Sequence, residues 1–542
     1  MNKRSQIEKL FQSTDDNVCS EGAGGMVAAA HPAATQAGVS MLEKGGNAAD
    51  AAVATALALC VCEPQACSLG GQSYGLLNMC GRSIFLDGSG RIPQHLNAST
   101  LTRSDVLYGY KGTSVPTTPV VLACMQKRFG RLTWEEVIEP AIELAEDGYE
   151  ITQLQHDLQK RELEFFLSIP GRSGSRYFLK DGAEPFDVGD TFVQPDLARL
   201  LKRLAENGVE EFYIGKTGRR IAEDIAGNGG FLSREDLAVI PWPHQRPAIE
   251  QQVFGCKMLT TPPPTQGRLL AYILLVAENM ATRGIDILSE EALDFFADLF
   301  YSAYRIRMEQ TPHPDLYNYL NDDILSQESI DKTVEQILNS LVQDVNHPGL
   351  EGGETTHLSV MDGEGNCVGI TQSVNMVYGS KAAADGLGFM YNNYLIDSFA
   401  LPNYHPHALI PGRTAPCSVA PFIMMANDGT PWLTGGSPGS QRIVTALSLF
   451  LIRVLHAGMP MDQAMRLPRF HCQEYKKVLV ELDRFPQEYS KLLEQRGYLV
   501  DHYPPFYFGA VHATLRMQDT SKYQGVAEIR RDGSASGVRL SN

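Results

Sequence analysis

The stretch "GGETTHLSV", residues 352–360, decides the fold: two glycines and a glutamate lead into adjacent threonines and a strand-like run. Residues 361–366, "MDGEGN", are rich in turn formers, and "CVGIT" after them has the pattern of a return strand. A hairpin folded about Glu364 places Thr355 opposite Ser373. The sequence therefore predicts a threonine at the start of a strand, behind a flexible leader.

That placement suggests a reaction. A threonine hydroxyl is a weak nucleophile unless a base activates it, and its own free α-amino group is such a base when the chain is cut before it. The α-amino group titrates near neutral pH. A flexible leader lets the Thr355 hydroxyl reach the carbonyl of Glu354. The alternative is a threonine pair that simply enters a strand, where threonine is common.

Composition limits the function classes. The chain has 542 residues, of which 43% are hydrophobic, and a formal net charge of −17. An acidic chain without a Lys/Arg block argues against nucleic-acid binding. The start lacks the apolar run of a signal peptide, and the longest apolar stretch, residues 48–62, is too short to span a bilayer. We therefore expect a cytoplasmic protein that does not bind membranes and keeps its ten cysteines reduced.

Element patterns predict a layered α+β protein. Residues 1–24 are polar and are expected to form a loose arm. Two helices broken by glycines at 45 and 46 follow, with Asn47 as an N-cap. A hairpin is expected at 75–87, strands from 356 to about 438, and a helical stretch at 438–468. Other helices are expected at 130–165, at 194–226, after the Pro-rich loop at 261–265, and in a surface hairpin at 317–350.

Several blocks together resemble the gamma-glutamyltranspeptidase family of N-terminal-nucleophile hydrolases. The main block is T-T-H-x-S-V-x-D…G-N-x-V…T-x-S-x-N…G-S, from Thr355 to Ser380. The others are "GGNAADAAVA" (45–54), "PQACSLGG" (64–71), "EFYIGKTGRRIAEDI" (211–225), "NGGFLSREDLA" (228–238), "PPPTQG" (262–267), "GSPGSQRI" (436–443) and "LPRFHCQ" (467–473).

This resemblance implies a four-layer αββα sandwich formed jointly by two chains of one precursor. The implied cut lies between Glu354 and Thr355 and gives a large subunit, residues 25–354 after the arm, and a small subunit, residues 355–542. The two form a heterodimer, or a dimer of such heterodimers. Thr355 is then nucleophile and, through its amine, general base. Ser373 takes the place of the family's second threonine, and Asn375 matches an asparagine that lines the site.

The run "GSPGSQR" matches the family's oxyanion loop, which offers two consecutive backbone N–H groups to the developing oxyanion. The matching positions are Gly439 and Ser440, where the family usually has two glycines. Serine keeps the N–H if a residue with a Cβ can adopt the required backbone angle. One such donor contributes about 3–4 kcal/mol in other hydrolases. A Gly-Pro turn before a helix is the simpler interpretation, and both can hold.

The substrate-binding positions depart from the family pattern. The family holds the substrate α-carboxylate with the arginine of a D-x-R motif, and here Ser89 takes that position. Arg91, two residues on, either replaces it or is a plain surface arginine. The family's serine pair is here Cys417 and Ser418.

The amine-binding positions are also changed. Tyr394 replaces an acidic or amide residue of the family, whereas Asp397 matches an aspartate that binds the substrate amine. A buried zwitterion needs charged or multiply hydrogen-bonding partners, so these changes predict weaker gamma-glutamyl specificity. The hypothesis is an autoprocessing threonine-nucleophile amidohydrolase or acyltransferase for a gamma-glutamyl or related small acyl amide. The alternative is a catalytically silent paralogue that serves as a binding or scaffold protein.

Other motifs carry less weight. "IGKTG" at 214–218 fails as a phosphate loop because residue 210 is glutamate. Cys60, Cys62 and Cys67 are expected to be buried thiols rather than zinc ligands. His357 either tunes the site or is a structural histidine in a strand, and the second is favoured. No cofactor and no metal are expected.

Overall fold

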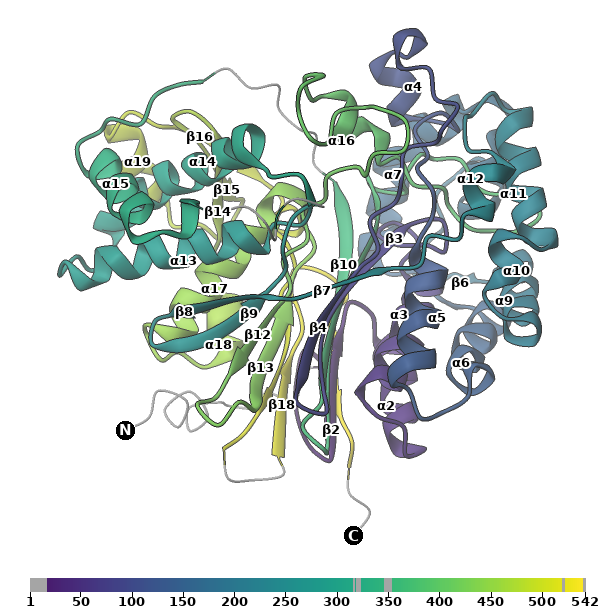
Figure 1. The fold of residues 1–542 in the computed structure, drawn as a ribbon, viewed down its shortest axis with the longest axis horizontal. Helices are drawn as coiled ribbons and strands as arrows, with labels where there is room; N and C mark the ends of the chain where they lie inside the picture. The colour runs from purple at the N-terminus through teal and green to yellow at the C-terminus, as the bar shows by residue number, and fades with distance from the viewer. Residues whose placement is uncertain (1–16, 315–316, 318–322, 346–352, 519–521, 540–542) are drawn as a thin grey trace.

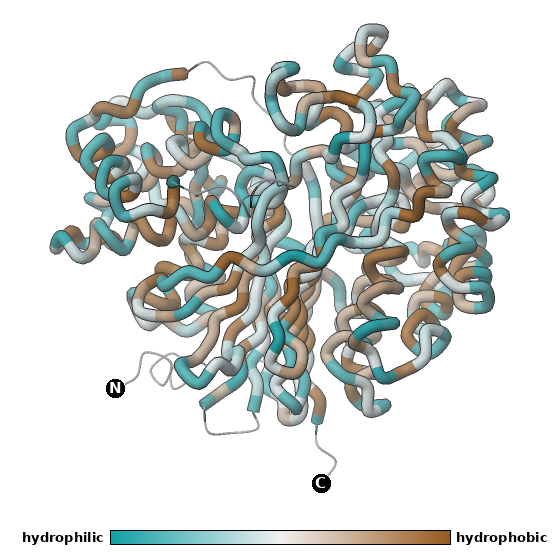
Figure 2. Tube along the Cα trace, viewed as in Figure 1, coloured by the Kyte–Doolittle hydropathy of each residue, from teal (hydrophilic) through white to brown (hydrophobic). Residues whose placement is uncertain are grey.

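The computed structural model describes residues 17–314, 317, 323–345, 353–518 and 522–539. Two seven-stranded antiparallel sheets pack face to face, and each has helices on its outer face (Figure 1). Hydrophobic stretches run along these strands and along the flanking helices, as Figure 2 shows. The expected four-layer αββα sandwich is therefore confirmed.

The first sheet carries the hairpin of interest at its centre. Its order is β19-β2-β10-β11-β3-β4-β7. The strands are β19 (Ser534–Gly537), β2 (Gly25–Ala29), β10 (Glu354–Asp362), β11 (Cys367–Asn375), β3 (Gln72–Met79), β4 (Arg82–Asp87) and β7 (His244–Arg246). The β3–β4 pair confirms the hairpin expected at 75–87.

The second sheet has the order β1-β18-β17-β13-β12-β9-β8. Its strands are β1 (Cys19–Ala23), β18 (Lys522–Val526), β17 (His512–Arg516), β13 (Pro431–Gly436), β12 (Phe422–Met425), β9 (Cys256–Thr260) and β8 (Ile249–Val253). Two small sheets consist of β14 (Phe470–Glu474), β15 (Lys477–Glu481) and β16 (Leu499–Tyr503), and of β5 (Tyr149–Glu150) with β6 (Thr191–Phe192).

Helices segregate to the two outer layers (Figure 1). On the side of the first sheet lie α2 (Pro32–Glu43), α3 (Ala48–Cys62), α5 (Thr118–Phe129), α6 (Trp134–Asp147), α7 (Gln153–Ser168), α9 (Pro195–Asn207), α10 (Glu210–Tyr213), α11 (Lys216–Gly227) and α12 (Arg234–Ala238). On the side of the second lie α13 (Gly267–Thr282), α14 (Leu293–Gln310), α15 (Gln327–Leu338), α17 (Ile443–Leu455), α18 (Met461–Arg466) and α19 (Gln487–Gln495). The shorter α4 (Arg103–Leu107), α8 (Ser173–Phe178) and α16 (Leu395–Phe399) complete the set described.

Helix α3 packs along β10 and β11. All its residues are buried, and its alanines allow the close approach that the sequence predicted. Asn47 caps it, as expected, and forms a capping box with Asp50. The carboxylate of Asp362, the last residue of β10, accepts the N–H of Ala48 at 2.9 Å, so this end of the hairpin is joined to the start of the helix.

Two expectations need correction. Residues 19–23 are not part of a loose arm, because β1 pairs with β18 along its whole length; residues 1–16 of that expected arm lie outside the described residues. Strands do not dominate from 356 to 438, because the chain between Asn375 and Phe422 contains α16, isolated bridges and turns with positive-φ glycines. Helix α15 confirms the helical character of 317–350, although much of that expected hairpin lies outside the described residues.

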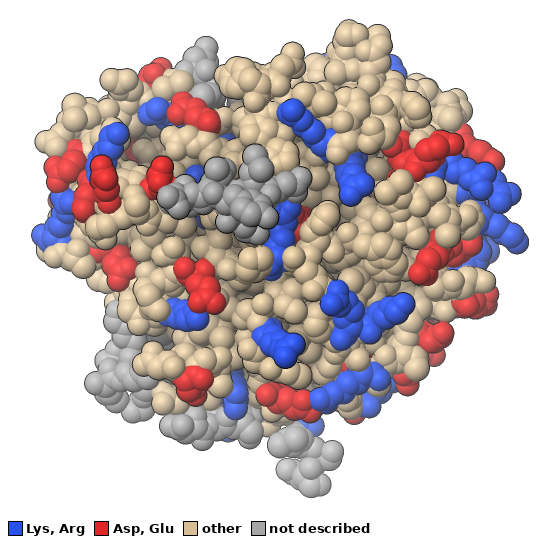
Figure 3. All heavy atoms as spheres, in the orientation of Figure 1, with Lys and Arg blue, Asp and Glu red and all other residues tan. Residues whose placement is uncertain are grey.

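None of the described helices is long and apolar enough to cross a bilayer. All ten cysteines are free thiols. On the face drawn in Figure 3, acidic and basic side chains are interspersed and do not form a single basic stripe.

The Asp362 carboxylate is a stability determinant that can be tested. It also accepts the N–H groups of Glu364 and Asn366, at 2.9 and 3.0 Å, and the side-chain amide of Asn366. Asp362→Ala leaves these buried donors without a partner, so we expect the free energy of unfolding to fall by about 2–4 kcal/mol. Asp362→Asn, which keeps an acceptor, is expected to lose less. Urea denaturation measures both, and a loss in Asp362→Asn equal to that in Asp362→Ala would contradict the expectation that one retained acceptor oxygen preserves part of this stability.

Candidate active site

The β10–β11 pairing fixes where Thr355 lies. Thr356 pairs with Gln372 and Glu354 pairs with Asn375, so one residue of β10, Thr355, faces two residues of β11, Ser373 and Val374. The pairing from Thr356 onward has the predicted register, and the bulge begins where the predicted pair would be. Thr355 therefore lies next to Ser373 at the start of the strand, and it is only 5% exposed.

The carbonyl before Thr355 is held by a hydroxyl. Ser373 Oγ donates to the Glu354 carbonyl oxygen at 2.5 Å, and the Asn375 N–H donates to Ser373 Oγ at 2.7 Å. The buried side chain of Tyr394 lies near the Ser373 hydroxyl. Because burial raises the pKa of Tyr394 well above its usual value, this phenol stays neutral. The arrangement withdraws electron density from the peptide carbonyl that precedes Thr355.

The side chain of Glu354 is clamped by an arginine. Glu354 Oε1 accepts the Thr355 N–H at 3.0 Å and pairs with Arg531 Nη1 at 2.5 Å. Both side chains are 4% exposed, and Arg531 also donates to the carbonyl oxygen of Phe506. Sequence reasoning missed Arg531, because its motif, "EIRRDG" at 528–533, carries no local sign of contact with a residue so far away in the sequence.

The expected oxyanion loop lies beside this peptide. A Cβ added to Gly353 would lie 3.3 Å from Ser440 Oγ and 2.8 Å from the Asn375 carbonyl oxygen. Gly439 has φ 122°, which favours glycine, whereas Ser440 has φ 52°, in the left-handed region that a residue with a Cβ can adopt at a cost of about 1–2 kcal/mol. Serine is thus accommodated where the family pattern has glycine. The loop leads into α17, so its N–H groups lie at a helix start.

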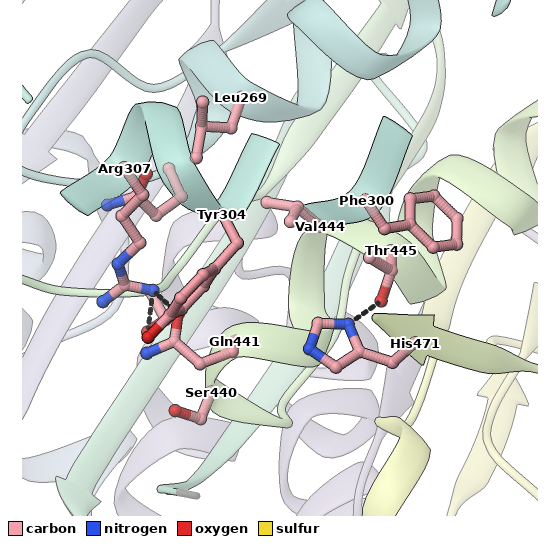
Figure 4. A pocket seen from close by; sticks show the side chains of 11 residues that line it. Leu269, Phe300, Tyr304, Arg307, Ser440, Gln441, Val444, Thr445 and His471 are labelled. Atoms are coloured by element: carbon pink, nitrogen blue, oxygen red, sulfur yellow. Dashed lines mark hydrogen bonds between the residues drawn. The ribbon is translucent and has the colours of Figure 1, made fainter. Parts of the chain in front are cut away.

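A small pocket opens onto the same loop (Figure 4). Its cavity volume is about 10 Å³, and its lining includes Tyr304, Ser418, Ser440 and the buried Arg307 of α14. Arg307 Nη1 donates to Ser418 Oγ at 2.8 Å and to the side-chain oxygen of Gln441. Arg307 Nη2 has no hydrogen-bond partner among the described residues. No sequence motif pointed to this arginine, which links the loop to the expected substrate-binding serine.

Two further predicted binding residues, Asp397 and Cys417, are electrostatic neighbours of Arg307, which lines this pocket. Burial lowers the pKa of Arg307, and the charge of Asp397 on α16 acts in the opposite direction, so the two are electrostatic neighbours. Cys417 is buried, and burial raises the pKa of its thiol to about 12. Cys417 is also an electrostatic neighbour of Tyr394, so these residues connect the pocket to Ser373.

The contacts described do not link the Arg91 side chain to this group. Its backbone forms an isolated bridge with Thr414. Ser89 donates to Asp87 Oδ1 at 2.6 Å, and the other oxygen of Asp87 pairs with Arg246 Nε at 3.0 Å. A role for Arg91 in place of the family arginine therefore stays a prediction.

The contacts of His357 fit a structural histidine. Its ring nitrogens contact the hydroxyls of Thr371 and Ser359 at 2.8 and 3.0 Å, and burial holds its pKa well below the usual value. Among the cysteines of the 60–67 segment, Cys60 and Cys67 contact the side-chain amide of Gln372. Within the part of the chain that the structure describes, no three His, Cys, Asp or Glu side chains are grouped as metal ligands.

Comparison with known proteins agrees with this geometry. The family model described as gamma-glutamyltranspeptidase matches residues 34–538. The chain belongs to the gamma-glutamyltranspeptidase family. It is 31% identical over 514 residues to a glutathione hydrolase proenzyme of Escherichia coli, covering 87% of this chain and 85% of that protein. It is 28% identical over 562 residues to an acylase ACY 1 proenzyme of a Pseudomonas species, covering 99% and 98%.

A solved structure has the same fold. The crystal structure of a cephalosporin acylase from Bacillus halodurans superimposes with a TM-score of 0.87 at 26% identity, covering 98% of each chain. These relatives confirm the predicted membership in the gamma-glutamyltranspeptidase family, the predicted fold and the predicted enzyme class. The matched region includes every candidate residue from Arg91 to Arg531.

The buried Glu354–Arg531 pair makes a testable contribution to stability. Removing one partner leaves an uncompensated buried charge, so we expect Arg531→Met to lower the free energy of unfolding by about 3–5 kcal/mol. Adding Glu354→Gln removes that charge and is expected to restore part of the loss. The cycle is measured by chemical denaturation in a Thr355→Ala background, which keeps the backbone identical in all variants. If the losses in the free energy of unfolding of the two single variants add up to that of the double variant, Glu354 and Arg531 are not energetically coupled.

Proposed function

We propose that the protein is a proenzyme that cuts its own backbone between Glu354 and Thr355 and then acts as a threonine-nucleophile amidohydrolase or acyltransferase. The observation that carries this proposal is the 2.5 Å hydrogen bond from Ser373 to the Glu354 carbonyl, one residue before a buried threonine at a strand start. The names of the relatives support it, because the E. coli and Pseudomonas proteins are both proenzymes.

The cut begins with attack by the Thr355 hydroxyl on the carbonyl carbon of Glu354. The Oγ–C bond forms, the C–N bond breaks, and the hydroxyl proton passes to the departing nitrogen. Ser373 stabilises the oxyanion as it develops on the carbonyl oxygen it already contacts. Water then hydrolyses the resulting ester, which leaves a carboxylate on Glu354 and a free amine and hydroxyl on Thr355.

In turnover the free amine of Thr355 takes the proton of its own hydroxyl. The hydroxyl attacks the substrate amide, the leaving amine departs, and water or a second amine releases the acyl group. The N–H groups of Gly439 and Ser440 face the oxyanion, and the acyl group extends towards Ser418 and Asp397. Asn375, which contacts the Asn393 carbonyl oxygen at 3.3 Å, borders this space.

The substrate class is a gamma-glutamyl or related small acyl amide. The relatives include glutathione hydrolases and acylases, so both kinds of substrate are candidates for this chain. The uncharged Tyr394 and Cys417 favour an acyl group with weaker zwitterion character than gamma-glutamyl. A panel of gamma-glutamyl, glutaryl and unsubstituted acyl anilides separates these possibilities, and product analysis with an added amine separates hydrolysis from transfer.

The alternative is a catalytically silent scaffold protein. Intact mass and N-terminal sequencing distinguish the two, because the proenzyme yields fragments ending at Glu354 and beginning Thr-Thr-His. A heterodimer of these fragments follows from the cut. The cytoplasmic location and any further dimerisation stay predictions, which fractionation and sedimentation test.

Ser373 provides the sharpest test of the cut. Ser373→Ala removes the donor to the carbonyl of Glu354, so we expect cleavage to slow by about 100–1,000-fold. Ser373→Thr keeps a hydroxyl and is the matched control, expected to cleave. The rate is followed by intact mass after synthesis of the uncut chain in vitro. Cleavage of Ser373→Ala at the wild-type rate, or a wild-type chain that stays whole, would contradict the mechanism.

Ser440 tests the oxyanion loop. Ser440→Gly keeps the N–H and relieves the left-handed strain, so turnover is expected to stay within a few-fold of wild type. Ser440→Pro removes the N–H and cannot adopt φ 52°, so the kcat is expected to fall by at least about 100-fold. Both are measured on preparations shown to be cut and folded. Equal activity of the two variants would exclude this N–H from the reaction.

A further inference from the structure

Glu63 is a buried acid that the mechanism above does not use. It caps the C-terminal end of α3 and is 3% exposed. Its carbonyl oxygen accepts the N–H of Ala66, and the Ala66 carbonyl oxygen accepts the N–H of Val374, one of the two β11 residues that Thr355 faces. Neither Glu63 Oε2 nor Thr356 Oγ1 has a well-formed hydrogen bond among the described residues. A buried carboxyl oxygen without a partner is costly, which indicates a role beyond packing.

Charged groups from several elements face Glu63. They are Glu354 on β10, and Arg531 and Asp532 in the segment after β18. The thiols of Cys62 and Cys67 are also electrostatic neighbours. Burial raises the pKa of Glu63 to about 8, with Glu354 and Asp532 acting in the same direction and Thr356 and Arg531 opposing them. Arg531, the cation among these groups, is already paired with Glu354.

The proposed cut changes this charge balance. The nitrogen of Thr355, whose N–H now points at Glu354 Oε1, becomes a free amine. It belongs to the residue that faces Val374, against which the turn from Glu63 to Ala66 lies, and it no longer has a covalent link to Glu354. A new ammonium in a buried acidic cluster needs an anionic partner, and Glu63 is the acid there with an unpartnered oxygen.

We propose that Glu63 is a positioning residue that pairs with the Thr355 amine after the cut and sets the pH at which this amine becomes a base. This inference rests on the proposed function. The carboxyl group and the amine form a coupled pair that shares one proton. The apparent pKa values that limit activity are therefore properties of the pair and not of either group alone. An ionised Glu63 stabilises the ammonium, whereas Arg531 destabilises it. Removing the acid therefore shifts the onset of activity to lower pH.

The test is the pH profile of acylation by p-nitrophenyl acetate, a small activated ester that does not require the natural substrate. The variants are Glu63→Gln, which is isosteric and uncharged, and Glu235→Gln, an exposed control on α12. Thr355→Ala supplies the background rate. We expect the acylation rate of the cut Glu63→Gln enzyme to rise at a pH about one to three units below that of wild type, on the acidic limb of the pH–rate profile. The acidic limb of Glu235→Gln is expected at the same pH as in wild type.

The outcomes separate this inference from the proposed function. An uncut wild-type chain contradicts both. A cut Glu63→Gln enzyme with the wild-type limb contradicts only the role of Glu63. If Glu63→Gln yields no folded, cut protein, Glu63→Asp decides, because it keeps the charge on a side chain one methylene shorter. If the acidic limb of the pH–rate profile of Glu63→Asp lies at lower pH than in wild type, the pairing is supported. If it lies at the same pH as in wild type, the pairing is overturned.

Discussion

The active-site geometry depends on the bulge at the start of β10. Because a single residue of β10 faces two residues of β11, Ser373 is displaced towards the carbonyl of Glu354 instead of pairing regularly with Thr355. The strand is immobilised by its neighbours: β2 and β11 flank it, α3 packs on one face, and β13 and β17 of the other sheet pack on the opposite face. A peptide held this firmly is preorganised for the proposed attack, since little further reorganisation is needed.

The same architecture explains how a cut chain would stay together. Each large sheet mixes strands from both sides of Thr355: β10 lies between β2 and β11, and β12 lies between β9 and β13. Separating the two parts would break strand pairs in both sheets and expose the core between them, which includes Tyr74 and Phe85 from one part and Met361 and Ile423 from the other. Loss of one peptide bond costs none of these contacts.

Local chemistry made part of this site predictable. The turn residues at 361–366 fixed the register that put Thr355 near Ser373, and the Gly-Ser run marked the loop at 439–440. Arg307, Arg531 and Glu63 were not predictable, because each comes from an element whose pattern is explained by helix packing or by a polar turn, and only tertiary structure brings it to β10. The β1 strand was missed for a related reason: an edge strand with polar residues looks like a loose segment until its partner is known.

In the proposed reaction, the contact between the small pocket and the expected oxyanion loop has a chemical consequence. One guanidinium group contacts both Ser418, which borders the expected acyl site, and Gln441, which follows Ser440 in the loop. In a buried site such contacts are strong because water does not compete with them. An acyl group that displaces Ser418 therefore also changes the contact that holds the loop. Under the proposed function, specificity and oxyanion stabilisation would then be coupled, so a poorly fitting acyl group would lower the rate of reaction as well as the affinity.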